Sequence, residues 1–203
     1  VGFQITPRIN AAGRLKNADI GVKLLITDDD KEAMKIAMEL DTSNIDRQRL
    51  EKEILLEAVE IVEEDKFEIH KKKAIVLVKE GWHPGVIGIV ASRLIDRYHR
   101  PTIVISLKDG IGKGSARGIK RFHVLDGLRE VESLLEKFGG HKMAAGITIR
   151  EENIQSFKEA FYNIADAKLT IDDLIPEVSL DAYITLAELS ENVVREIECL
   201  APF

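Results

Sequence analysis

The chain has 203 residues, of which 45% are hydrophobic and 32% are charged, so it can bury a sizeable core and disorder is not expected. The net charge of −6 provides no overall basic field, so any binding of nucleic acid must depend on a local patch. No apolar run approaches the roughly 20 residues of a membrane-spanning helix, and the single cysteine, Cys199, excludes an internal disulfide and fits a reducing cytoplasm.

Residues 1–30 read as a loop-rich lead-in because Pro7, Gly13 and Gly21 interrupt it. The acidic run at residues 28–30 indicates the start of a helix. From residue 31 to about residue 65 there is no Gly or Pro, and apolar residues recur at helical spacing around a polar middle. This pattern predicts one long helix that bridges two domains, or two helices joined near Asn44.

An alternation of strands and helices follows, which predicts an α/β domain of about one hundred residues. Strands are expected at residues 74–78, 101–106, 111–119 and 144–149, with a turn at 108–110. Helices are expected at residues 86–98, 124–137 and 151–167, and a loop at 138–141. After residue 168 a strand over 175–181 and a helix over 186–199 are expected to begin a further domain.

The segment from Gly139 to Gly146 is the first candidate site. Two adjacent glycines, Gly139 and Gly140, let backbone amides approach an anion, and His141 adds a further donor. The alternative is a tight turn that carries an incidental histidine. From spacing alone the two interpretations remain open.

The segment from Gly112 to Gly118 is the second candidate. If it is a strand, Lys113, Ser115 and Arg117 share one face, where a cation, a hydroxyl and a guanidinium could follow a phosphate backbone. The alternative is a polar edge that faces solvent.

Two further candidate segments precede these in the chain. In residues 81–88, His83 precedes a predicted helix start whose free amides favour an anion, whereas Trp82 is better explained as a buried anchor. In residues 7–14, Arg8, Asn10 and Arg14 could contact phosphates or brace a neighbouring domain.

No catalytic or metal site is predicted within the chain. Its five histidines are scattered, and none has a partner at the spacing of metal ligands. The acidic run at residues 28–30 is explained by the preference of a helix N-terminus for acids.

Taken in order, these segments resemble the RecJ family within the DHH phosphoesterases. The matching text is PRINAAGR at residues 7–14, EGWHPGVIGIVASRL at 80–94, GKGSAR at 112–117 and FGGHKMAAG at 138–146. The closing residues 200–203 are similar to the start of a family segment that normally continues, and the beginning at Val1 reads as an internal cut.

The resemblance implies an architecture. Residues 1–30 would be the tail of the catalytic DHH domain and residues 31–69 a helical connector. Residues 70–167 would form the DHH-associated substrate-binding α/β domain, and residues 168–203 the truncated start of an OB-like nucleic-acid-binding domain.

The resemblance also implies a function. The family degrades single-stranded DNA from the 5′ end in DNA repair and recombination, with Mn²⁺ or Mg²⁺ held by Asp and His clusters that would lie upstream of Val1. This chain is therefore expected to bind DNA without cutting it, and a helicase or a single-strand-binding protein is an expected partner. Alternatives are a DHH-family phosphodiesterase of cyclic dinucleotides or short oligonucleotides, and a non-catalytic nucleic-acid-binding module.

Overall fold

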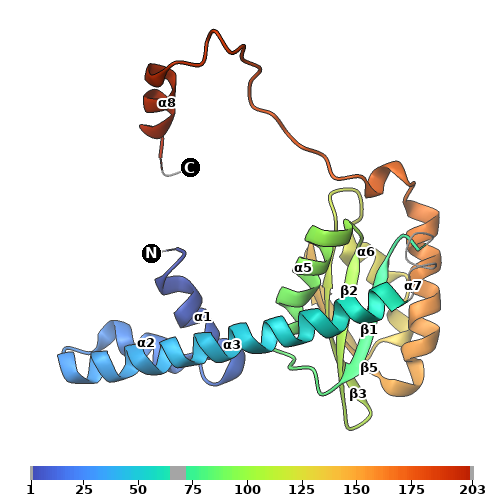
Figure 1. The fold of residues 1–203 in the computed structure, drawn as a ribbon. Helices are drawn as coiled ribbons and strands as arrows, with labels where there is room; N and C mark the ends of the chain where they lie inside the picture. Colours follow the sequence, from blue (N-terminus) through green and yellow to red (C-terminus); the bar gives the residue numbers. More distant parts are fainter. Residues whose placement is uncertain (1, 65–71, 202–203) are drawn as a thin grey trace.

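The computed structural model describes residues 2–64 and 72–201. A small helical unit is joined by one long helix to an α/β unit, from which an extended segment leads to a last short helix (Figure 1). The mixed α/β class expected from the sequence is confirmed. The predicted boundary between residues 69 and 70 lies outside the described residues.

The lead-in is helical, which corrects the expectation of a loop. Helix α1 (Ile5–Leu15) and helix α2 (Asp19–Ile26) pack against the first half of the long helix. Pro7 lies in the first turn of α1, where its missing amide hydrogen breaks no helical hydrogen bond. Gly13 lies in the last turn, so neither residue interrupts the helix. Three buried side chains form the centre of this unit: Ala12, Ile36 and Leu40.

The long helix α3 (Asp30–Glu64) is continuous over 35 residues, so the choice between one helix and two is settled in favour of one. The acidic run starts it as predicted, because Asp29 Oδ1 accepts a hydrogen bond from the Lys31 amide at 2.8 Å. At 1.5 Å per residue α3 is about 50 Å long. Its first half packs on α1 and α2 and its second half on the sheet unit, so it connects the two (Figure 1).

The sheet has five strands in the order β1-β2-β3-β5-β4, of which only the β1–β2 pair is parallel. The strands are β1 (Ile75–Glu80), β2 (Thr102–Lys108), β3 (Ile111–Arg117), β4 (Lys137–Gly140) and β5 (Ala144–Arg150). Helix α5 (Ile87–Tyr98) makes the crossover that a parallel pair requires. The predicted turn at 108–110 is confirmed, since Asp109 and Gly110 adopt positive φ between paired Lys108 and Ile111.

Two predictions fail at one edge of the sheet. Residues 138–141, expected as a loop, contribute most of strand β4, because pairing with β5 overrides the weak strand preference of two glycines. The helix expected over 124–137 is only α6 (Val124–Arg129), followed by a short 3-10 turn, η1 (Glu132–Leu134). Leu128 at the end of α6 and Val131 before η1 are both buried in the core.

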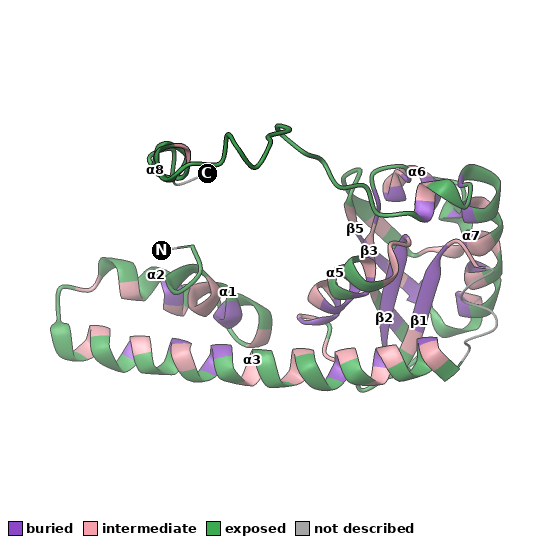
Figure 2. Cartoon of the chain, turned by 45° about the horizontal axis from the view of Figure 1, so that its top comes forward, coloured by how far each residue is buried: buried purple, intermediate pink, exposed green. Residues whose placement is uncertain are grey.

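Helices cover the two faces of the sheet unequally. Helix α6 and helix α7 (Ile154–Lys168), which follows the 3-10 turn η2 (Glu151–Asn153), pack on one face around Phe122, Phe157 and Phe161. Helix α5 covers the other face over β2 and β3, and the end of α3 covers it over β1. On this second face Gly146 of β5 and Gly139 of β4 are both exposed. Strands β1 and β2, by contrast, are largely buried (Figure 2).

The C-terminal segment departs from expectation. After the 3-10 turn η3 (Asp172–Leu174), residues 175–181 form no strand, because no neighbouring strand among the described residues pairs with them. The helix expected over 186–199 is the shorter α8 (Glu191–Glu198), capped by Ser190, whose Oγ accepts from the Val193 amide. Among the described residues, no helix combines the length and the apolar character needed to cross a membrane.

Candidate nucleic-acid interface

Ser115 and Arg117 form the centre of the site, on strand β3. As strand alternation predicts, both side chains lie on the face that carries α5. Arg117 Nη1 donates hydrogen bonds to Ser115 Oγ and to the Ala116 carbonyl, both at 2.9 Å. These bonds fix the guanidinium next to the hydroxyl, so an anion could accept from both groups at once.

Among the residues that the structure describes, Arg117 lacks the negative partner that a half-buried cation normally has. Burial lowers the pKa of Arg117, and the nearby positive charge of Arg14 lowers that pKa further. Neither guanidinium forms an ion pair with a carboxylate in the described parts of the chain. Two adjacent arginines that repel one another and lack a counter-charge are the electrostatic signature of an anion site.

Arg14 reaches this site from the last turn of α1. Its Nη1 donates to the Gly85 carbonyl at 3.1 Å. A Cβ atom at Gly85 would lie 2.1 Å from the Arg14 carbonyl oxygen, so only glycine lets the loop before α5 approach α1 this closely.

The first turn of α5 closes another side of the site. A Cβ atom at Gly88 would lie 2.9 Å from Arg117 Nη2 and 3.0 Å from Ser115 Oγ. The positive end of the α5 dipole therefore adds to the charge of the two arginines. Residues 7–14, 81–88 and 112–118, three of the segments singled out in the sequence, meet here.

The two adjacent glycines have different roles. Gly139 pairs with Gly146, which pairs with Ser115, so Gly139 shares the face of the site roughly 10 Å away across two strand spacings. A Cβ atom on Gly139 would have no neighbour within 4 Å. Gly140 has φ of 152°, and its Cβ would lie 2.3 Å from the Ala144 carbonyl oxygen, so this glycine is needed for the turn.

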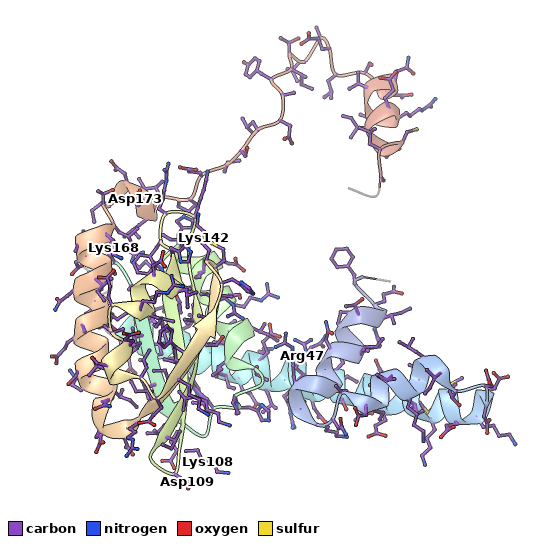
Figure 3. The ribbon with its side chains drawn as sticks, turned by 180° about the vertical axis from the view of Figure 1, so that it is seen from behind. Arg47, Lys108, Asp109, Lys142, Lys168 and Asp173 are labelled. Atoms are coloured by element: carbon purple, nitrogen blue, oxygen red, sulfur yellow. The ribbon has the colours of Figure 1, made fainter. Side chains whose placement is uncertain are left out.

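His141 can take part only through its ring, because its amide donates to the Ala144 carbonyl at 2.7 Å. The exposed turn that carries His141 and Lys142 lies at the Arg117 end of β3, where Ala144 pairs with Arg117. Figure 3 shows Lys142 at this end of the sheet and Lys108 at the opposite end.

Lys113 and His83 lie further along the same face. Lys113 is exposed, and both residues line a groove of about 880 Å³ between the loop after β1 and the β2–β3 hairpin. His83 Nδ1 accepts a hydrogen bond from the Gly85 amide at 3.1 Å, so its ring also shapes the loop. Trp82 is buried, as predicted for an anchor.

The structure does not bring Arg8 and Asn10 to this site. Arg8 Nε donates to Asp41 Oδ1 of α3 at 2.7 Å and Arg8 Nη1 to the Gln4 carbonyl at 2.6 Å, which favours the bracing alternative for this residue. The side chain of Asn10 is exposed and has no hydrogen-bond partner among the described residues.

Sequence reasoning missed the close packing at Gly85 and Gly88, and it missed Glu57, which accepts a hydrogen bond from Trp82. The only signal for the glycines was the helix start, which does not reveal a neighbour 71 positions away in the chain. Within residues 2–64 and 72–201, no group of three or more His, Cys, Asp or Glu side chains could hold a metal ion.

Comparison with known proteins supports the resemblance to RecJ. A family model described as the DHHA1 domain matches residues 71–167. The single-stranded-DNA-specific exonuclease RecJ of Bacillus subtilis is 42% identical over 205 residues, which cover 100% of this chain and 26% of that protein. Crystal structures of RecJ from Thermus thermophilus are also similar. The complex with Mn²⁺ has a TM-score of 0.86 and 37% identity over 99% of this chain and 29% of that one.

The T. thermophilus complex with Mg²⁺ gives a TM-score of 0.84 and 36% identity over 99% of this chain and 30% of that one. The chain thus spans about a quarter to a third of the length of these relatives. The similarity to RecJ extends over the whole chain, and the family model matches residues 71–167, so the chain is RecJ-like and contains a DHHA1 domain.

Proposed function

We propose that this chain binds the 5′ end of single-stranded DNA for a 5′→3′ exonuclease of which it forms a part. The observation that carries the proposal is the meeting of Arg14, Arg117 and Ser115 beside the first turn of α5, without a carboxylate among the described residues. A terminal phosphate supplies the missing negative charge and accepts from several donors at once. The B. subtilis relative is named as a single-stranded-DNA-specific exonuclease, which supports this substrate.

In this proposal the residues of the chain act by binding and orientation. Arg117 and Ser115 hold the terminal phosphate from the sheet, and Arg14 holds it from the helical unit. The exposed backbone at Gly139 and Gly146 lets the strand lie close to the sheet. Fixing the DNA end in one place positions the next phosphodiester for hydrolysis, and such positioning supplies much of the rate enhancement in phosphoryl chemistry.

We further propose that the nuclease uses Mn²⁺ or Mg²⁺, held by a DHH domain outside this chain. The support is that the T. thermophilus structures are complexes with these ions. The proposed domains are residues 1–30 as the tail of the DHH domain, 31–69 as a connector, 70–167 as the DHH-associated domain and 168–203 as the start of an OB-like domain. Cytoplasmic DNA repair and recombination, with a helicase or a single-strand-binding protein as partner, completes the proposed role.

A substrate panel tests the proposal. The whole protein, supplied with Mn²⁺, is expected to degrade 5′-phosphorylated single strands, to leave blunt duplexes intact and to release nucleotides from the 5′ end. The 203-residue chain alone is expected to bind the same strands without cutting them. Preference for cyclic dinucleotides or very short oligonucleotides would contradict the proposal and favour a phosphodiesterase.

A second measurement separates an exonuclease from a non-catalytic binding module. If the site only recruits DNA, Arg117→Ala in the whole protein will weaken binding but leave the turnover of bound complexes unchanged. The proposal requires turnover at saturating DNA to fall as well, because the variant no longer fixes the end of the strand.

A further inference from the structure

Glu57 connects the long helix to the loop that precedes α5. Its Oε2 atom accepts hydrogen bonds from Trp82 Nε1 at 2.8 Å and from Lys79 Nζ at 2.9 Å. These bonds, that of Trp82 foremost, lower the pKa of Glu57, so the carboxylate stays charged. The Lys79 pair is 45% and 43% exposed and contributes little to stability. The Trp82 side chain is 4% exposed, so its N–H depends on Glu57 for a partner.

The loop that Trp82 begins has a conformation defined by local hydrogen bonds. Ser106 Oγ donates to the Trp82 carbonyl and ties the loop to strand β2. The His83 ring accepts from the Gly85 amide, and the His83 carbonyl accepts from the Val86 amide at 3.0 Å. The position of Trp82 therefore determines the position of Gly85.

Gly85 and Gly88 are the two points where this loop and the start of α5 contact the anion site. Gly85 lies against the Arg14 carbonyl and accepts from the Arg14 guanidinium, while Gly88 lies against Arg117 and Ser115. A Cβ at either glycine would come closer than 3.0 Å to an atom of an arginine, so these contacts leave little room for the loop to shift. A displaced loop would separate the two arginines or push into them.

We propose that Glu57 is a positioning residue for the anion site. Through Trp82 it holds the loop where Gly85 and Gly88 keep Arg14 and Arg117 side by side. The long helix that joins the helical unit to the sheet thereby also sets the geometry of the site between them. This inference rests on the proposed function, because the effect on DNA is defined through the 5′ phosphate.

The test compares four variants of the 203-residue chain. Glu57→Ala removes the acceptor, Glu57→Gln keeps an oxygen for Trp82, and Lys79→Ala removes only the exposed ion pair. Glu60→Ala is the matched control, since it removes an exposed carboxylate from the same helix. Each variant is titrated with a 5′-phosphorylated and a 5′-hydroxyl oligonucleotide, and the ratio of the two dissociation constants measures the phosphate contact. Trp82 is the only tryptophan in the sequence, so its fluorescence reports on the loop directly.

Glu57→Ala is expected to shift the Trp82 emission and to reduce the phosphate-dependent ratio about tenfold, the loss of roughly one charge-assisted hydrogen bond. Binding of the 5′-hydroxyl strand should stay unchanged. Glu57→Gln should restore most of the ratio, and the other two variants should retain it within about twofold, as expected for exposed groups. These four results together support the positioning role.

The inference is overturned if Glu57→Ala shifts the Trp82 emission but leaves the ratio of the two dissociation constants at its wild-type value. It is also overturned if Glu57→Gln, which keeps the acceptor, reduces the ratio about tenfold relative to the wild-type chain, and this result can be read even if the alanine variant does not fold. A wild-type chain that does not distinguish the two oligonucleotides contradicts the proposed function instead, and the inference with it.

Discussion

Replacing Arg117 should remove phosphate recognition without damaging the fold. A hydrogen bond to a charged group contributes about 1.5–3 kcal/mol, so Arg117→Met should weaken binding of a 5′-phosphorylated oligonucleotide about 10- to 150-fold. A 5′-hydroxyl strand should lose much less, because its end does not carry the terminal phosphate charge. Equilibrium titration of the 203-residue chain with the two strands measures both effects.

Arg117→Met is also expected to leave the stability of the chain intact. Arg117 is half-buried and its pKa is lowered by burial and by Arg14, so the folded chain holds a charge that its surroundings disfavour. Methionine keeps much of the volume and removes that charge. The stability of Arg117→Met, measured by thermal unfolding, should therefore equal that of the wild-type chain or exceed it by up to about 1 kcal/mol.

Two control variants make the result specific. Arg117→Lys keeps the charge but not the planar fork, so it should recover only part of the phosphate preference. Arg150→Ala removes an arginine from the far end of β5, where it pairs with Glu136, and should leave the preference intact. If Arg117→Met weakens both strands equally, or destabilises the fold by several kcal/mol, the assigned role of Arg117 is wrong.

Two further predictions concern glycines. Gly140→Ala should destabilise the chain by about 2 kcal/mol or more, since its Cβ would lie 2.3 Å from the Ala144 carbonyl oxygen. Gly139→Ala should change the stability by under about 0.5 kcal/mol, and chemical denaturation of the two variants compares them. Gly85→Ala should separate the loop from α1 and reduce the phosphate-dependent affinity ratio roughly tenfold, because about one contact from Arg14 is lost. An unchanged ratio would show that this close approach is not needed.

Much of the sheet unit could be predicted from the sequence because its pattern is local. Strands β1, β2, β3 and β5 and helices α5 and α7 were all expected close to their observed positions. Buried strands rich in branched residues and helices with an apolar stripe carry their own signal. The 28–30 helix start was also correct, because capping depends on neighbours in the chain.

The failures occurred where structure depends on distant partners. Pro7 and Gly13 suggested a loop, but a first-turn proline and a last-turn glycine both fit within α1. Residues 175–181 read as a strand in the sequence, yet no described strand pairs with them. Strand β4 was missed for the opposite reason, because its partner β5 compensates for two glycines.

The candidate site could likewise be predicted only where its signal is local in the chain. Strand alternation correctly placed Ser115 and Arg117 together. Without knowing that residues 5–15 form a helix, the sequence could not show that Arg8 turns toward Asp41 while Arg14 turns toward Gly85. The two arginines are six positions apart in α1, so they project about 120° from one another around it.

The central claim is that Arg14 and Arg117 hold the terminal phosphate between them. Its most direct test is the structure of the chain bound to a short 5′-phosphorylated oligonucleotide. The claim predicts the terminal phosphate within hydrogen-bonding distance of both guanidinium groups and of Ser115 Oγ, with the strand lying over Gly139. A complex in which the phosphate binds elsewhere and leaves these groups without an anion would contradict it.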